Sequence, residues 1–178
     1  MKKTIALLFA GLFILLGSAS QVFAQATNEE VKSWAEKAAV TVLNFGFTDF
    51  DERKAANKPY FTEKGYQAFY EALEQSMFFK VASKGNLSAT SVLKCPAQVT
   101  EAVNAEGVKG WQVDFPLEVS HTNKNESWVS LQKVTVRVEQ DTSTQALGIA
   151  QWIAMPFSEI DTLPCTPETP AAPAPTDE

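Results

Sequence analysis

The chain has little of what most catalytic and metal sites are built from. It contains one histidine, His121, and its two cysteines, Cys95 and Cys165, are too far apart in sequence to form a C-x-x-C pair. It also lacks a G-x-S-x-G nucleophile motif. A hydrolytic triad would have to use His121, which comes at the end of a predicted strand and is interpreted as an exposed turn residue. We therefore predict no catalytic residue, no metal site and no cofactor.

Positive charge is scarce as well. Arg53 and Arg137 are the only arginines, the lysines are scattered, and the formal net charge is -6. Proteins that bind nucleic acid neutralise its phosphates with clustered lysine and arginine side chains. The composition therefore predicts no nucleic-acid partner.

A long apolar run occurs at the N-terminus. Two lysines precede residues 4–16, a run of about a dozen residues, whereas a membrane-spanning helix needs roughly 20. Small residues then favour cleavage after Ala24 or Ala26, which is typical of a secretory signal peptide. We expect an exported chain that begins at Gln25 or Thr27. An uncleaved membrane anchor is the alternative.

The rest of the chain divides into one domain and a tail. Residues 1–26 form the predicted signal peptide, and residues 27–161 are long enough for one ordinary domain. Residues 162–178 contain five of the nine prolines and are predicted to be extended or disordered.

The two cysteines lie outside the predicted leader. In an oxidising exported compartment an even pair usually forms a disulfide. We therefore predict a bond between Cys95 and Cys165, with two buried free thiols as the alternative.

The first half of the domain has helical periodicity. Thr27 and Glu30 form a capping box at the start of a helix whose apolar stripe runs from Val31 to Val42. A short helix is predicted over residues 51–57. A second long helix begins after Thr62, another capping residue, and continues as far as Ser76.

From Met77 onward the period changes from 3.6 to 2, which predicts strands. Runs at residues 77–82 and 87–93 precede an antiparallel meander of four strands. Pro116 within this meander indicates an edge position or a bulge. Helices followed by a curved sheet predict an α+β fold with the helices packed on one face. The four strands are Gln98–Val103, Lys109–His121, Ser127–Gln140 and Ala146–Met155.

One hydrophobic core is expected where the two long helices meet the Lys109–His121 strand. Its predicted members are the large apolar residues of these three surfaces. They are Trp34, Phe69, Leu73, Trp111 and Phe115.

Four segments carry recognisable residue patterns. An aromatic stretch at Leu43–Phe50 is followed by a Y-F-T-x-x-G-aromatic helix start within Tyr60–Leu73. A G-W-x-V-x-x-P strand lies at Gly110–Leu117, and a closing strand at Gly148–Trp152. In this order the segments resemble the DotI/IcmL family of type IVB (Dot/Icm) secretion and conjugation systems.

The resemblance implies a periplasmic half-cone domain, nuclear-transport-factor-like, as in VirB-type periplasmic domains. It implies a role in assembly, not catalysis, with protein components of a secretion complex at the inner membrane as partners. An oligomer of its own copies or with other proteins is compatible with this role. The family domain is held by a transmembrane helix, whereas this chain has a predicted cleavable leader, so an accessory paralogue is equally compatible.

Two further expectations concern the surface through which the protein binds a partner or a ligand. The aromatic residues Phe45, Phe47 and Phe50 beside Gly46 have the composition of a protein-interface anchor. The alternative is that they cap the core. A different function also stays open, in which a stand-alone periplasmic protein binds a small apolar ligand inside the half-cone.

Overall fold

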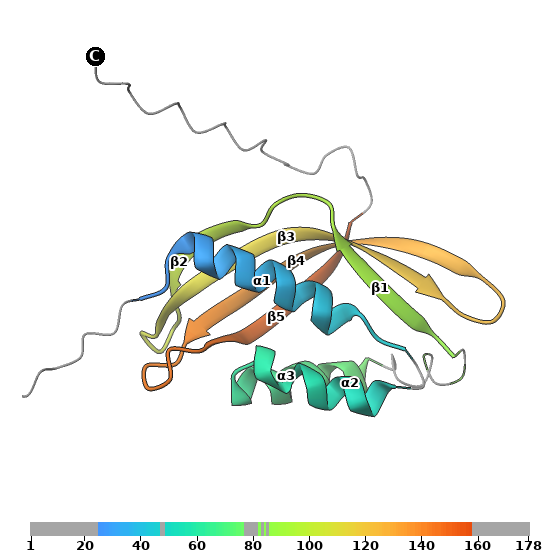
Figure 1. Ribbon diagram of the computed structural model, residues 1–178, viewed down its shortest axis with the longest axis horizontal. Helices are drawn as coiled ribbons and strands as arrows, with labels where there is room; N and C mark the ends of the chain where they lie inside the picture. The colour runs from blue at the N-terminus through green and yellow to red at the C-terminus, as the bar shows by residue number, and fades with distance from the viewer. Residues whose placement is uncertain (1–24, 47–48, 77–81, 83, 85, 158–178) are drawn as a thin grey trace, which may run out of the picture.

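The computed structural model describes residues 25–46, 49–76, 82, 84 and 86–157. They form two layers, with helices on one face of a twisted antiparallel sheet (Figure 1). The helical elements are α1 (Asn28–Leu43), α2 (Phe50–Asn57), the 3-10 turn η1 (Lys58–Tyr60) and α3 (Glu63–Gln75). The predicted α+β architecture is confirmed.

The sheet contains five strands, and all the pairs are antiparallel. The main order is β1-β3-β4-β5, and β2 pairs with β3 on the same side as β1. The strands are β1 (Ser88–Leu93), β2 (Gln98–Val103), β3 (Lys109–Thr122), β4 (Ser127–Gln140) and β5 (Leu147–Phe157).

The predicted four-stranded meander is incomplete, because the run at 87–93 also joins this sheet as β1. β1 pairs with the C-terminal part of β3 and β2 with its N-terminal part. The 14 residues of β3 can pair along one side with two strands of six residues each, placed end to end. This pairing between distant segments has no local signal in the sequence.

Pro116 lies at the junction between β1 and β2, and not at a sheet edge or a bulge. Its carbonyl oxygen accepts a hydrogen bond from the Lys94 N–H at 3.2 Å. In antiparallel strands the N and the C=O of one residue face the same neighbour. The N–H that proline lacks would therefore face Lys94, the residue just after the end of β1, and not a residue within β1 or β2.

α1 packs on the sheet through the stripe that the sequence predicts. The Thr27 hydroxyl accepts a hydrogen bond from the Glu30 N–H, and the Glu30 carboxylate accepts one from the Thr27 backbone N–H. At the start of the helix the Trp111 indole N–H donates to the Asn28 side chain at 3.1 Å. The buried residues of α1 are Val31, Ala35, Ala38, Ala39 and Val42.

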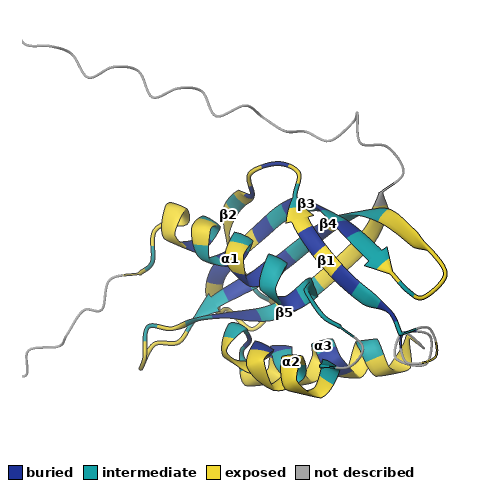
Figure 2. Cartoon of the chain, turned by 45° about the vertical axis from the view of Figure 1, so that its right-hand side comes forward, coloured by how far each residue is buried: buried dark blue, intermediate teal, exposed yellow. Residues whose placement is uncertain are grey.

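The core lies between α1 and the inner face of β3 and β4 (Figure 2). Trp111 and Phe115 are fully buried there, while Trp34 and Phe69 are half-buried and pack against the cluster. Leu73 is the exception among the predicted members. It is half-buried and lines a cavity near the end of α3, because this part of the helix does not lie against the core.

Candidate functional site

The N-terminal end of α3 is attached to the edge strand β5. The Thr62 N–H donates a hydrogen bond to the Ile149 carbonyl oxygen at 3.1 Å, next to a parallel bridge between Phe61 and Ile149. In the β4–β5 register Val138 faces Ile149 and Arg137 faces Gln151, so β5 has one extra residue between them. This bulge lies where the start of α3 meets the strand.

Two glycines make this close approach feasible. A Cβ on Gly65 would lie 2.1 Å from the Ile149 carbonyl oxygen, and a Cβ on Gly148 would lie 2.9 Å from the Thr62 nitrogen. Neither distance is compatible with a side chain. The segments Tyr60–Leu73 and Gly148–Trp152, which carry two of the four sequence patterns, are therefore in direct contact.

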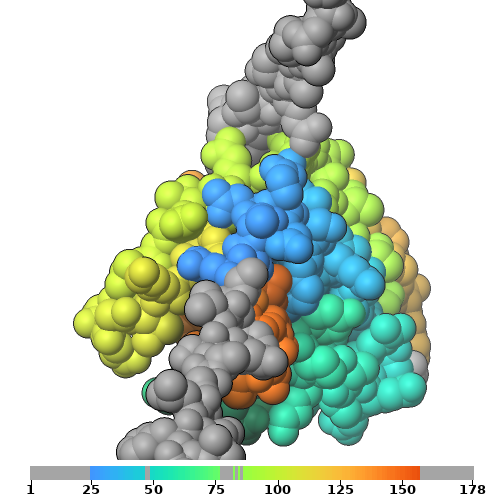
Figure 3. All heavy atoms as spheres, turned by 60° about the vertical axis from the view of Figure 1, so that its left-hand side comes forward, coloured from blue at the N-terminus to red at the C-terminus, as the bar shows by residue number. Residues whose placement is uncertain are grey.

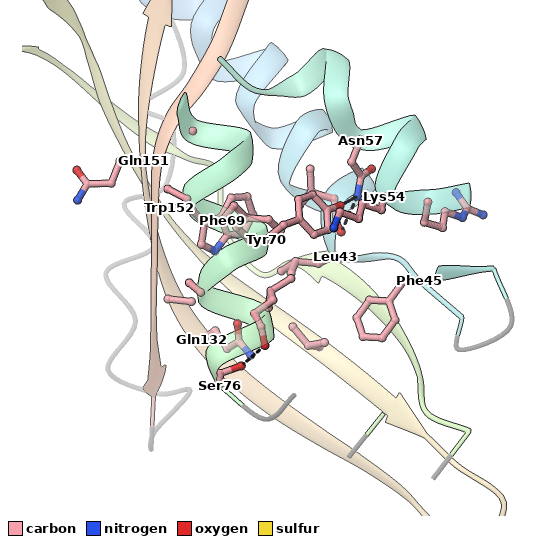
Figure 4. A pocket seen from close by; sticks show the side chains of 18 of the residues that line it. Leu43, Phe45, Lys54, Asn57, Phe69, Tyr70, Ser76, Gln132, Gln151 and Trp152 are labelled. Atoms are coloured by element: carbon pink, nitrogen blue, oxygen red, sulfur yellow. Dashed lines mark hydrogen bonds between the residues drawn. The ribbon is translucent and has the colours of Figure 1, made fainter. Parts of the chain in front are cut away.

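Beyond this attachment, a cavity of about 700 Å³ lies between α3, α2 and the inner face of β3 to β5 (Figure 4). Of the strands, α3 contacts mainly β5. Figure 3 shows the turn before β5 and the adjoining part of the strand (orange) at the surface between α1 (blue) and the green helices. Apolar walls of the cavity come from Val42, Leu43, Phe45, Phe50, Phe69, Leu73, Val119 and Trp152.

Aromatic rings form the wall beside α3. The Phe69 ring packs edge-on against Trp152 of β5, with 5.4 Å between centroids, and both are drawn facing each other in Figure 4. Phe69 also meets Phe61 at 5.1 Å and Tyr70 at 5.2 Å. This cluster fixes the distance between α3 and β5.

Polar groups deep in the wall bind one another. The buried Asn57 amide donates to the Val42 carbonyl oxygen at 3.3 Å and to the Tyr70 hydroxyl oxygen at 3.2 Å. Burial raises the pKa of Tyr70, which keeps this hydroxyl neutral. Tyr66, the other tyrosine of α3, donates its hydroxyl proton to the Lys54 carbonyl oxygen at 3.0 Å.

Two cationic side chains of α2 line the rim. Arg53 pairs with Asp49 at 3.1 Å, and Lys54 pairs with Glu74 at 3.3 Å. The Lys54 ammonium also lies 5.0 Å from the centroid of the Tyr70 ring. Both ion pairs are substantially exposed, so each contributes little to stability.

His121 is not the exposed turn residue that the sequence suggests. It lies in β3, is half-buried, lines the cavity and stacks on Trp128 with 5.0 Å between ring centroids. Its Nε2 is 2.9 Å from the Ser130 hydroxyl oxygen, and burial lowers its pKa. The strand continues through His121 because β1 and β4 pair with it on both sides.

The predicted interface phenylalanines meet the same cavity. Phe45 exchanges two backbone hydrogen bonds with Ala89 of β1, at 3.0 and 2.8 Å. Its ring lies 6.4 Å from Phe50, which in turn lies 6.3 Å from Tyr70. Phe45 and Phe50 are both half-buried, and Phe47 lies outside the described residues.

The remaining predicted sites are described in part. Cys95 is buried between β1 and β2, whereas Cys165 lies outside the described residues. Ala24 also lies outside them, but Ala26 packs against the core and its N–H donates to the Gln140 side chain at 3.0 Å.

The described ranges contain neither a metal-binding cluster nor a membrane-spanning helix. There, no three histidine, cysteine or acidic side chains are grouped so that they could hold a metal ion. Among the helices of the same ranges, none is long and apolar enough to cross a membrane.

Sequence reasoning left open a ligand site inside the half-cone but did not identify which residues line the cavity, and it missed the glycine contact beside it. Gly65 in a helix and Gly148 in a strand are each unfavourable for their element, so both carried a signal of close approach. The sequence alone did not show that Gly65 lies against Ile149 or that Gly148 lies against Thr62.

Several solved structures are similar to this fold. No curated protein sequence matches the chain. The solved periplasmic domain of DotI has 23% sequence identity and a TM-score of 0.69, covering 75% of this chain and 99% of that domain. An IcmL-like type IV secretion system protein from Legionella pneumophila has 19% identity and a TM-score of 0.66, covering 76% and 97%.

More distant structures have the same fold. The VirB8 protein of Agrobacterium tumefaciens has 11% identity and a TM-score of 0.50, covering 77% of this chain and 99% of that one.

The model of a family described as an inner-membrane complex component of the type IVb secretion system matches residues 15–156. Because this match spans most of the sequence, the chain belongs to the DotI/IcmL family of type IVB secretion systems.

Proposed function

We propose that this protein is a non-catalytic assembly component of a type IVB secretion apparatus and acts by binding other proteins of the inner-membrane complex. The observation that carries the proposal is the family match over residues 15–156. The fold shared with the periplasmic domain of DotI supports it, because that likeness covers 99% of the solved domain. In this role the half-cone would serve as a scaffold for contacts with other subunits.

We further propose that the protein is exported to the periplasm and that its leader is removed. Of the two cleavage sites, the one after Ala24 fits the fold better, because Ala26 packs against the core and bonds Gln140. Cleavage there leaves Ala26 within the mature chain. N-terminal sequencing of the protein from a periplasmic fraction should then begin at Gln25. A chain that retains Met1 and sediments with the inner membrane would overturn the cleavage.

The aromatic loop Phe45–Phe50 is the proposed contact with partner proteins. Phe45 and Phe50 are half-buried and line the cavity. Large aromatic side chains of this kind are typical anchors of protein interfaces. The loop follows α1 directly and is held in place by its backbone pairing with β1.

Crosslinking in cells tests the proposal. A photoreactive residue introduced at Phe47 should give adducts with secretion components, identified by mass spectrometry. A second photoreactive residue, in place of Asp51, reports on the same contact when Phe47 itself is replaced. The double variant Phe47→Ser/Phe50→Ser should lose the adducts formed through this second residue. Val103→Ser is the matched control, because Val103 is 63% exposed and lies on β2, away from the loop.

Circular dichroism must first show that the double variant folds. A folded double variant with undiminished crosslinks would remove the loop from the interface. Deletion of the whole gene without any effect on translocation would overturn the role in secretion itself.

A further inference from the structure

We propose that the cavity beneath α3 binds a single-chain amphiphile with an anionic head, of the long-chain carboxylate type. This binding activity goes beyond the proposed role in assembly. The chain of the ligand would lie between α3 and the inner face of the sheet, and its carboxylate would lie beside Arg53 and Lys54.

The interior of the cavity has the chemistry of a site for an apolar chain. Its volume of about 700 Å³ lies within the range of about 300 to 1,000 Å³ that ligand pockets have. The buried Asn57 amide donates to both the Val42 carbonyl oxygen and the Tyr70 hydroxyl oxygen, so both of its amide protons are used within the wall. They therefore do not call for a polar group on the ligand, and an apolar cavity of this kind takes up apolar molecules.

The rim has the charge that an anionic head requires. Arg53 and Lys54 follow each other on α2 and both line the cavity. Glu74, the partner of Lys54, has a side chain that is 60% exposed, whereas Asp49, the partner of Arg53, is 35% exposed. Because exposed ion pairs of this kind are weak, a ligand carboxylate can replace one of them at little cost.

The arrangement also explains why the cavity persists. The contact of Gly65 with Ile149 fixes the N-terminal end of α3 against β5. Further along the helix, the Phe69 and Trp152 rings stand between α3 and the strand. Collapse of α3 onto the sheet would require these rings to move, so the space is maintained by well-packed groups.

Fluorescence titration of the purified, delipidated mature protein with dansyl-undecanoic acid tests the site. The wild-type protein should bind one probe per chain with enhanced emission, and oleate should displace it. Ala72→Trp places a large ring among the lining residues and should weaken binding at least tenfold. Gln75→Trp is the matched control, because Gln75 lies on the same helix, is exposed and does not line the cavity.

A second arm tests the head group. Lys54→Met should raise the inhibition constant of oleate several-fold, after correction for the weaker binding of the probe's own carboxylate, and should leave the inhibition constant of oleyl alcohol unchanged. Equal loss for both competitors would overturn the assignment of the carboxylate to the rim. Absence of probe binding by the folded wild-type protein, or equal binding by Ala72→Trp and Gln75→Trp, would overturn the site. An apolar peptide that displaces the probe where oleate does not would identify a protein segment as the occupant and would also overturn the proposal.

Discussion

The backbone N–H of Thr62 and the carbonyl oxygen of Ile149 are joined by a hydrogen bond of 3.1 Å, although 87 residues separate them in sequence. Thr62 also caps α3, since its hydroxyl accepts a hydrogen bond from the Gly65 N–H at 3.0 Å. One residue therefore both begins the helix and attaches it to the sheet. The attachment determines where α3 lies and, with it, where the cavity opens.

Gly65→Ala should destabilise the protein by about 1 to 3 kcal/mol, the usual cost of overpacking. Alanine normally stabilises a helix interior relative to glycine by about 1 kcal/mol, so the sign of the effect is diagnostic. The expected loss arises because the new Cβ would lie 2.1 Å from the Ile149 carbonyl oxygen. Urea denaturation measures it. Gln67→Ala, on the exposed face of α3, should stay within about 0.5 kcal/mol. A gain in stability for Gly65→Ala would mean that α3 lies further from β5.

Asn57→Ala should cost about 1 to 3 kcal/mol, because it leaves the Val42 carbonyl and the Tyr70 hydroxyl without their buried partner. Tyr70→Phe should cost less in the Asn57→Ala background than in the wild type, since the shared hydrogen bond is already lost. A double-mutant cycle from urea denaturation measures this coupling. Strictly additive losses would show that the two side chains do not interact.

His121 should make the protein less stable as the pH falls below 7. Burial lowers its pKa in the folded state, so the unfolded chain binds the proton more readily. The stabilising contribution is complete above the unfolded value of about 6.5 and decreases as the pH falls toward the folded value. His121 is the only histidine, so the window from pH 7 to 5.5 isolates it from most other groups.

The measurement compares urea midpoints of the wild type and His121→Phe across this window. Phenylalanine keeps a flat ring against Trp128 but has no proton to gain. The difference between the two proteins should therefore change with pH. A constant difference would show that His121 titrates alike in the folded and unfolded chains.

Cys95 and Cys165 should be bonded in the exported protein. The buried position of Cys95 between β1 and β2 would then be tied to the chain beyond β5. Closing a loop of about 70 residues stabilises by roughly 4 kcal/mol on the chain-entropy model. Thiol labelling of the unfolded, unreduced protein should find no free thiol, and reduction should lower the melting temperature. Two labelled thiols per chain would contradict the bond.

The sequence predicted the elements whose patterns are local. The stripe from Val31 to Val42 repeats with the period of a helix, and the residues from Trp111 to Val119 alternate with the period of a strand. Both patterns identify the buried face of one element without reference to any other. The N-caps Thr27 and Thr62 are local for the same reason, because each bonds a backbone N–H three residues further along.

The sequence identified several residues of the candidate site but not how they are arranged. Phe45 and Phe50 were identified from the sequence as aromatic residues of interest, but Leu73 was assigned to the core and His121 to a turn. Their positions depend on how far α3 stands from the sheet and on how far β3 extends. Both depend on how separate elements are placed, and the periodicity within one element gives no information about that placement.

By itself the sequence determined the α+β class, the buried faces of α1 and β3, and the capped starts of the two long helices. Only the tertiary structure decided that β1 and β2 share one side of β3, and that Gly65 lies against Ile149. The physical reason is that periodicity and capping depend on residues a few positions apart, whereas strand pairing and close packing depend on where distant segments meet. The cavity is the space between such segments, so it exists only in the folded chain.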